Sequence, residues 1–197
     1  MVRKGSAVRV RCWALVGPTR SVGPYGAAHR GRAIEGTIEL PIMSHELPVR
    51  RATDADMEVC ARLLIDFNSE FDEPAPPAET LAGRLHSLVA VGDTIVLLAG
   101  QRPVGIAVLR FRGAIWNPGL ECYLAELYVV PAMRRQGVGR ALMHAVIDEA
   151  RGCGAETIEI GVDDPDLAAR RLYESTGFTN RTGGPGGALM YVYERDI

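Results

Sequence analysis

Apolar residues recur at the spacing of an α-helix in several parts of the chain. Between residues 57 and 71 they stand at positions i, i+3, i+4, i+7 and i+8, which puts them on one face of a helix. Prolines at 74, 76 and 77 end that helix, and a second is expected over residues 78–91. Two more stripes predict helices that begin near residues 137 and 165.

Residues at the ends of these segments support the same boundaries. Thr53, followed by Asp56, resembles a capping box that opens the first helix. Pro165 is expected as the first residue of the last helix. Gly177 is expected to end that helix in the left-handed conformation, with Phe178 as the apolar partner of the cap.

Short apolar runs between the helices predict a sheet. The expected strands cover residues 48–51, 94–99, 104–110, 122–130, 157–162 and 189–193. We expect the last of them to close the sheet. Strands interleaved with helices over about 150 residues predict one mixed α/β domain, residues 45–197.

The first 44 residues differ from the rest in composition. They hold seven basic and two acidic residues, whereas the remainder holds 15 basic and 22 acidic residues. We interpret residues 1–44 as a basic extension outside the fold. The acidic domain disfavours nucleic acid and favours cationic partners, although acidic surfaces also simply aid solubility.

The remaining composition excludes several other classes of protein. No apolar run approaches the roughly 20 residues that cross a bilayer, so we expect no membrane role. The four cysteines and four histidines are scattered, which predicts no metal site and no disulfide framework. Such cysteine usage suits a reducing cytoplasm.

The most informative stretch leads from a strand that ends in Val-Val-Pro into the third helix. Its residues are Arg134, Arg135, Gln136, Gly137, Val138, Gly139 and Arg140. A glycine-bearing loop at a helix N-terminus presents unpaired N–H groups at the positive end of the helix dipole, and it predicts a phosphate site. The spacing is neither that of a Rossmann loop nor that of a P-loop. The simpler alternative is an ordinary surface loop.

Two motifs in this chain resemble the signatures of the GNAT superfamily of acetyltransferases. The first is Arg/Gln-x-x-Gly-x-Gly/Ala after a Val-x-Pro strand end, matched by Arg134, Gly137 and Gly139. The second is Ala-x-x-Leu-Tyr-Glu-x-x-Gly-Phe, matched by Ala169, Leu172, Tyr173, Glu174, Gly177 and Phe178. The resemblance covers residues 47–197. It implies a mostly antiparallel sheet that is flanked by helices and splayed at the cofactor site.

The same resemblance implies acetyl-CoA as co-substrate, without a metal, and gives roles to individual residues. Backbone groups of Leu127, Tyr128 and Val129 would meet the acetyl and pantetheine portion, and the amides of residues 135–140 would wrap the pyrophosphate. Tyr173 would protonate the leaving thiolate. Many members carry Asn where this chain has Asp166, which puts that side chain's contact with the cofactor in doubt.

Acetyl transfer to an amine needs a base, because an ammonium group cannot attack a thioester. Glu126 lies in an apolar strand, where burial would raise its pKa, and it is the first candidate. It could instead be a structural or substrate-binding carboxylate. Glu121 is the reserve candidate. Tyr173 could alternatively be a core aromatic residue at helical spacing.

Three acidic residues, Asp163, Asp164 and Asp166, cluster before the last helix. They would attract and orient a cationic substrate, or they could only reflect the preference of helix N-termini for acidic residues. Asp-Asp-Pro and the carboxylate at Glu126 are similar to the aminoglycoside 3-N-acetyltransferase branch. That resemblance implies an aminoglycoside or another small cationic amine as acceptor, and a role in antibiotic resistance.

Two other functions stay open at this stage. One is acetylation of a protein N-terminus or lysine, which would need an open groove. The other is a catalytically silent sensor that binds acyl-CoA. The resemblance also suggests a homodimer that pairs through the last strand.

Overall fold

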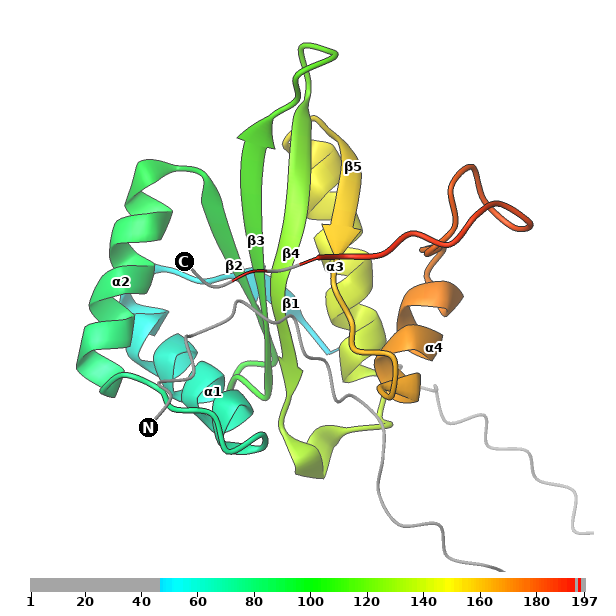
Figure 1. Cartoon of the computed structure of the whole chain (residues 1–197). Helices are drawn as coiled ribbons and strands as arrows, with labels where there is room; N and C mark the ends of the chain where they lie inside the picture. The colour runs from blue at the N-terminus through cyan, green and yellow to red at the C-terminus, as the bar shows by residue number, and fades with distance from the viewer. Residues whose placement is uncertain (1–46, 194, 196–197) are drawn as a thin grey trace, which may run out of the picture.

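The computed structural model describes residues 47–193 and 195 of the 197-residue chain. The basic extension predicted over residues 1–44 lies outside the described residues. The domain is built from a five-stranded sheet with two helices against each face (Figure 1). This mixed α/β architecture confirms the fold class predicted from the sequence.

The sheet has its strands in chain order, β1-β2-β3-β4-β5. The strands are β1 (Val49–Arg51), β2 (Thr94–Ala99), β3 (Gly105–Gly113), β4 (Leu120–Val129) and β5 (Ala155–Ile160). The first four run antiparallel to their neighbours, and β5 runs parallel to β4. The parallel step requires a crossover connection, which a helix supplies.

Helices cover the two faces of this sheet and define two hydrophobic cores. The helices are α1 (Met57–Ser69), α2 (Ala78–Val91), α3 (Val138–Gly152) and α4 (Leu167–Ser175). Leu98 and Ile106 belong to the core against α1 and α2, whereas Leu97 and Leu109 belong to the core against α3 and α4. Because successive strand residues face opposite sides, the near-continuous apolar runs of β2 and β3 serve both cores.

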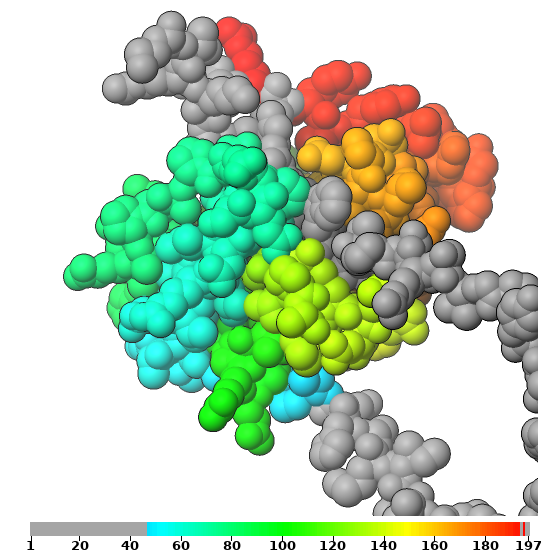
Figure 2. Space-filling view, turned by 90° about the horizontal axis from the view of Figure 1, so that it is seen from below, coloured from blue at the N-terminus to red at the C-terminus, as the bar shows by residue number. Residues whose placement is uncertain are grey.

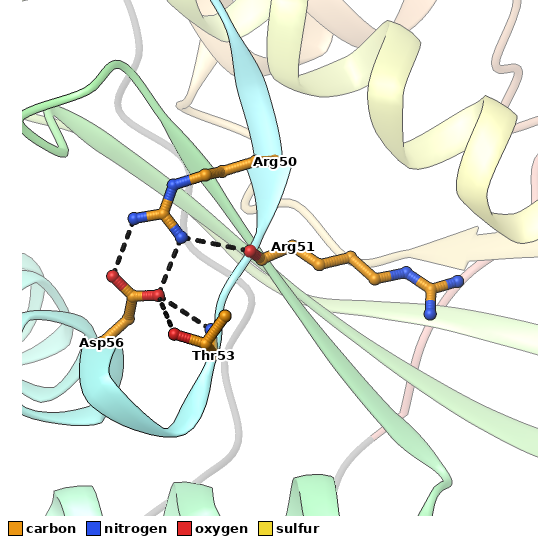
Figure 3. A network of polar contacts seen from close by, with 4 residues as sticks. All are labelled: Arg50, Arg51, Thr53 and Asp56. Atoms are coloured by element: carbon orange, nitrogen blue, oxygen red, sulfur yellow. Dashed lines mark hydrogen bonds and ion pairs between the residues drawn. The ribbon is translucent and has the colours of Figure 1, made fainter.

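A polar network fixes the chain between β1 and α1 (Figure 3). The Asp56 carboxylate accepts hydrogen bonds from both terminal nitrogens of Arg50, at 2.7 Å each. It also accepts from the Thr53 amide and hydroxyl, at 2.8 Å each, which confirms the predicted capping box. The Arg50 guanidinium and these hydrogen bonds hold the pKa of Asp56 well below its usual range. The box opens a short 3-10 helix, Asp54–Asp56, ahead of α1.

The C-terminal end of α4 confirms the predicted glycine cap. Gly177 is left-handed with φ 95°. The Phe178 amide donates to the Tyr173 carbonyl at 3.0 Å, and the Gly177 amide donates to the Glu174 carbonyl at 3.1 Å. These two bonds form a Schellman motif. The prediction for the other end is wrong, because Asp166 is the N-cap and Pro165 stands before it.

The predicted strand over residues 189–193 is also absent from the described sheet. Hydrogen bonds join it instead to a turn: the Met190 amide donates to the Asn180 carbonyl at 2.8 Å, and the Thr182 amide of the turn donates to the Ala188 carbonyl at 2.9 Å. The segment therefore finds its partner in residues 180–182 and leaves β5 without a neighbour on its outer side. Its apolar side chains are exposed, up to 91% for Tyr193.

Helices of the described part are too short and too polar to cross a membrane. The three described cysteines, Cys60, Cys122 and Cys153, are free thiols.

Candidate functional site

An extra residue in β4 turns Glu126 towards the α1–α2 side of the sheet. Val108 of β3 pairs with Glu126, but the neighbouring Leu109 pairs with Leu124. Ala125 is therefore the additional residue of a β-bulge. Directly opposed residues face the same side of a sheet, and Val108 packs in the core against α1 and α2. Without the bulge, alternation from Leu124 would bury Glu126 against α3.

The surroundings of Glu126 suit a proton acceptor. Its side chain is largely enclosed in the apolar strand, and burial raises the pKa of the carboxyl to about 7. The direction agrees with the sequence-based expectation, because an apolar environment favours the neutral acid. At neutral pH the group is poised between its two protonation states, as an efficient general base requires.

β4 and β5 separate next to this residue. Their last paired residues are Leu124 and Ile160, where β5 ends, while β4 continues to Val129 (Figure 1). The far half of β4, which holds the predicted contacts Leu127, Tyr128 and Val129, thus has a strand neighbour on one side only. The side chains of these three residues are buried. The edge left open consists of backbone groups, to which an extended amide-bearing chain could bond.

The loop after β4 has the geometry of an anion site. A short 3-10 helix (Pro131–Met133) leads to Arg135 and Gly137, both left-handed with φ 62° and 86°. No side chain caps α3, so the amides of its first turn lack intrahelical partners. A Cβ at Gly137 would meet no atom within 4 Å. The first helical hydrogen bond runs from Ala141 to the Gly137 carbonyl at 2.9 Å.

A close approach holds the start of α3 against the sheet. A Cβ on Gly105 of β3 would lie 3.0 Å from both the Leu142 side chain and the Tyr128 carbonyl, and 3.3 Å from the Val138 side chain. A side chain at position 105 would therefore push against the helix and the neighbouring strand, and glycine lets the two pack this closely. The sequence offered one signal for this contact, an isolated glycine at the start of a predicted strand.

The three arginines of the loop have different environments. Arg135 and Arg140 are exposed beside the loop amides, as a phosphate site would require. The Arg134 side chain is only 10% exposed and donates to both carboxylate oxygens of Glu70, at 2.6 and 2.7 Å. The guanidinium of Arg134 therefore faces α1. Gln136 likewise turns back and donates to the Ala132 carbonyl at 2.8 Å.

Tyr173 lies on α4 and packs in the core against α3. The residue is 4% exposed, its hydroxyl oxygen is inaccessible to solvent, and its ring lies 6.2 Å from that of Phe178. Glu126 and Tyr173 thus lie on opposite faces of the sheet. The structure supports core packing for Tyr173, and its role as an acid stays a prediction.

The acidic cluster before α4 divides into three different side chains. Asp166 is 6% exposed and caps α4 by accepting from the Ala169 amide at 2.9 Å. Burial raises the pKa of the Asp166 carboxyl, and its Oδ2 atom has no hydrogen-bond partner among the described residues. Asp164 pairs with Arg170 at 2.7 Å, and Asp163 is exposed. Much of this charge therefore serves the local structure of α4.

Glu121, the reserve base, lies at the other end of β4. Its Oε2 accepts from the Arg112 side chain at 2.6 Å, next to the β3–β4 hairpin. It stands five positions before Glu126 on the same strand, about 16 Å along an extended chain. The described part of the chain contains no group of His, Cys, Asp and Glu side chains that could hold a metal ion.

Sequence reasoning missed Glu70. It belongs to neither motif, yet it contacts Arg134 and Tyr128, both of which were predicted to lie at the cofactor. A usable signal existed, since Glu70 stands at the C-terminal end of a helix, where acidic residues are unfavourable.

Comparisons with known proteins agree with this arrangement. The model of the Acetyltransferase (GNAT) family matches residues 58–178. A stretch of 54 residues, 27% of this chain, is 43% identical to the L-methionine sulfoximine/L-methionine sulfone acetyltransferase of Salmonella typhimurium, covering 32% of that protein. A stretch of 62 residues, 32% of this chain, is 42% identical to the [ribosomal protein bS18]-alanine N-acetyltransferase of Escherichia coli K12, covering 42% of it. The chain thus aligns with less than half the length of these relatives.

Solved structures extend the likeness to the whole described domain. An acetyltransferase from Arthrobacter sp. FB24 is 42% identical with a TM-score of 0.69, covering 84% of this chain and 100% of that one. An aminoglycoside acetyltransferase from an uncultured soil metagenomic sample, solved with sisomicin, has a TM-score of 0.62 and covers 78% of this chain and 99% of that one. At 19% identity the second likeness concerns the fold alone.

Proposed function

The chain belongs to the acetyltransferase (GNAT) family, and from that premise we propose that it is an acetyl-CoA-dependent N-acetyltransferase acting on a primary amine. The observation that carries the proposal is the open half of β4, which leads through a short loop to the uncapped N-terminus of α3. An extended pantetheine chain would bond to the free strand edge, and its pyrophosphate would lie on the amides of residues 135–140.

The residues present fit this co-substrate. Arg135 and Arg140 are exposed beside the uncapped α3 amides, and Asp166, the N-cap of α4, has a buried carboxylate oxygen without a hydrogen-bond partner among the described residues. Burial raises the pKa of Asp166, and the charge of Arg134 opposes this rise. That oxygen could accept a hydrogen bond from an amide or hydroxyl donor of the bound molecule.

Acetyl-CoA would supply an activated acyl thioester. Glu126, with its pKa near 7, would take a proton from the acceptor ammonium directly or through one water. The amine nitrogen would then form a bond to the acyl carbon as the carbon–sulfur bond breaks. The Tyr173 hydroxyl would give its proton to the leaving sulfur and regain one from the nitrogen as the amide forms, while Glu126 passes its proton to solvent.

The acceptor is our finer proposal. The working hypothesis is an aminoglycoside or another small cationic amine, drawn towards Glu126 and the exposed Asp163. A second candidate is the α-amino group of an amino acid or a peptide. It is favoured by the names of the matched relatives, which acetylate L-methionine sulfoximine and an alanine of a ribosomal protein. The use of Asp164 and Asp166 within α4 weakens the case for an acidic pocket.

Thiol release from acetyl-CoA with a panel of acceptors tests both the proposed N-acetyltransferase activity and the proposed class of acceptor. The panel contains aminoglycosides, small polyamines, free amino acids and short peptides with an N-terminal alanine. Turnover with any of them supports the enzyme, and the preferred acceptor decides between the two candidates. Tight binding of CoA without turnover on any acceptor would favour the catalytically silent sensor.

Two further proposals concern the state of the protein in the cell. The three free cysteines are consistent with a reducing cytoplasm. The exposed apolar side chains of residues 189–193, and an outer side of β5 that pairs with no described strand, support a homodimer. Light scattering on the intact chain measures its mass directly, and a monomer at micromolar concentration would contradict the dimer.

A further inference from the structure

Glu70 ends α1 at a place where a carboxylate is locally unfavourable. It is the C-cap residue, and the last turn of α1 contains no basic residue. The free carbonyls of a helix C-terminus repel negative charge. A residue that breaks a local preference without a local gain is expected to serve a contact elsewhere in the fold.

That contact is made with the end of β4 and the loop that follows it. The Glu70 carboxylate accepts two hydrogen bonds from Arg134, at 2.6 and 2.7 Å, and one from the Tyr128 hydroxyl at 3.0 Å. The Arg134 Nε donates to the Val129 carbonyl at 2.9 Å, and its guanidinium lies 5.7 Å from the centre of the Tyr128 ring. Four hydrogen bonds and one ring contact therefore hold the ion pair between Arg134 and Glu70 in place.

This network fixes the conformation at the start of the loop. Arg134 is extended, and the next residue, Arg135, is left-handed at φ 62°, an unfavourable state for a side chain with a Cβ. Such a conformation persists only where the surroundings determine it. The view from below places the segment after α1 beside the loop after β4 (Figure 2). Glu70 thus connects the end of α1 to the loop after β4.

We propose that Glu70 is a positioning residue that presets the loop amides of residues 135–140 for the pyrophosphate by holding Arg134 and Tyr128 in place. The proposal rests on the proposed function, because it assumes that CoA binds this loop. It also gives the Arg134 side chain a structural task, so that Arg135 and Arg140 are the side chains left to meet phosphate. A preset loop binds its ligand without the cost of ordering it first.

The test compares Glu70→Gln and Glu70→Ala with the matched control Glu58→Gln. Glu58 lies on the same helix and pairs with Arg62, but both side chains are about two-thirds exposed. We expect the Kd of CoA, measured by calorimetry, and the KM of acetyl-CoA to rise about tenfold in Glu70→Ala and less in Glu70→Gln. The kcat at saturating acetyl-CoA is expected to change less than about twofold. Glu58→Gln is expected to match the wild type in all three.

A double-mutant cycle separates positioning from general damage. If Glu70 acts through Arg134, Glu70→Ala combined with Arg134→Ala binds CoA no more weakly than the worse single variant. Lower thermal stability or kcat in Glu70→Gln and Glu70→Ala, with the Kd of CoA unchanged, would overturn the proposal and leave only a structural ion pair. Failure of the wild-type chain to bind CoA would instead sink the proposed function, and this inference with it.

Discussion

The two strand–loop–helix units at the open end of the sheet differ at their helix N-termini. The loop between β4 and α3 ends in a left-handed glycine, and no side chain caps α3. The loop between β5 and α4 ends in Asp166, which caps α4, while Asp164 is paired with Arg170. The first helix end has no side-chain cap, whereas at the second the Asp166 side chain accepts from the Ala169 amide.

This difference indicates that an anionic ligand can bind at the N-terminus of α3 rather than at that of α4. An uncapped helix end forgoes the roughly 1 kcal/mol that a cap contributes, which is reasonable where an anion takes the place of the cap. The acidic residues before α4 looked like a substrate site in the sequence, but the structure explains much of their charge locally. Five predictions test this contrast, from the largest expected effect to the smallest.

Glu126→Gln removes the base from the β4–α3 unit and is expected to have the largest effect. General-base catalysis contributes about 10²- to 10⁴-fold, so kcat should fall in that range while the Kd of CoA stays unchanged. In the wild type kcat/KM should rise with pH through about 7, where the carboxyl loses its proton. Steady-state kinetics across pH measures both, and a variant that keeps the same pH profile would contradict the assignment.

The same substitution should stabilise the fold at alkaline pH. The folded pKa of Glu126 lies above its ordinary value, so its contribution to stability is full below pH 4.5 and is lost as pH rises through about 7. Glutamine avoids the buried charge, and we expect a gain of about 1–3 kcal/mol at pH 8 and almost none at pH 4. Denaturant unfolding at the two pH values measures this difference.

Gly137→Asp places a negative side chain at the open end of α3. Backbone strain at φ 86° and repulsion of phosphate should weaken CoA binding about 10- to 100-fold. Gly177→Asp is the matched control, because Gly177 has φ 95° and equally open surroundings. Calorimetry should show weaker CoA binding in Gly137→Asp alone, and a smaller loss of stability there than in Gly177→Asp, because a carboxylate is favourable at a helix N-terminus and unfavourable at a C-terminus. Equal weakening in both would remove the distinction between the two units.

Asp166→Ala removes the cap of α4 and should cost about 1 kcal/mol of unfolding free energy. Asp166→Asn keeps an oxygen that can cap the helix but removes the buried negative charge. Because burial already disfavours that charge and raises the pKa of the carboxyl, the stability of this variant should equal that of the wild type or exceed it. Thermal unfolding ranks the three proteins. A rise in the acceptor KM of Asp166→Asn would show instead that this carboxylate binds the substrate.

Arg170→Ala should have the smallest effect. It breaks an ion pair in which the Asp164 side chain is 95% exposed, and such pairs contribute about 0–1 kcal/mol. If Asp164 takes no part in acceptor binding, freeing it should leave the KM of a cationic amine unchanged. A lower KM for aminoglycosides in this variant would restore the acidic-cluster hypothesis.

Much of this account was accessible from the sequence. Helical periodicity identified α1 and α3, and the Gly177 cap and the Thr53–Asp56 box were read from residue types alone. These features are local, and their geometry follows from neighbouring residues. The glycine-bearing loop before α3 was identified for the same reason, and its role as an anion site stays a prediction.

Features that depend on long-range pairing could not be predicted in this way. The bulge at Ala125 exists only in the register between β3 and β4, so alternation alone would have placed Glu126 on the wrong face. The contact between Glu70 and Arg134 joins residues 64 apart. The strand expected over residues 189–193 failed because apolar alternation does not specify a partner, and residues 180–182 supplied it.

Amide hydrogen exchange on the intact chain, with and without saturating CoA, tests the central claim most directly. The account predicts that CoA protects the amides of residues 135–140, at the uncapped end of α3. It predicts little change at the amide of Ala169, which Asp166 already holds. Protection at the start of α4 with none over residues 135–140 would contradict it.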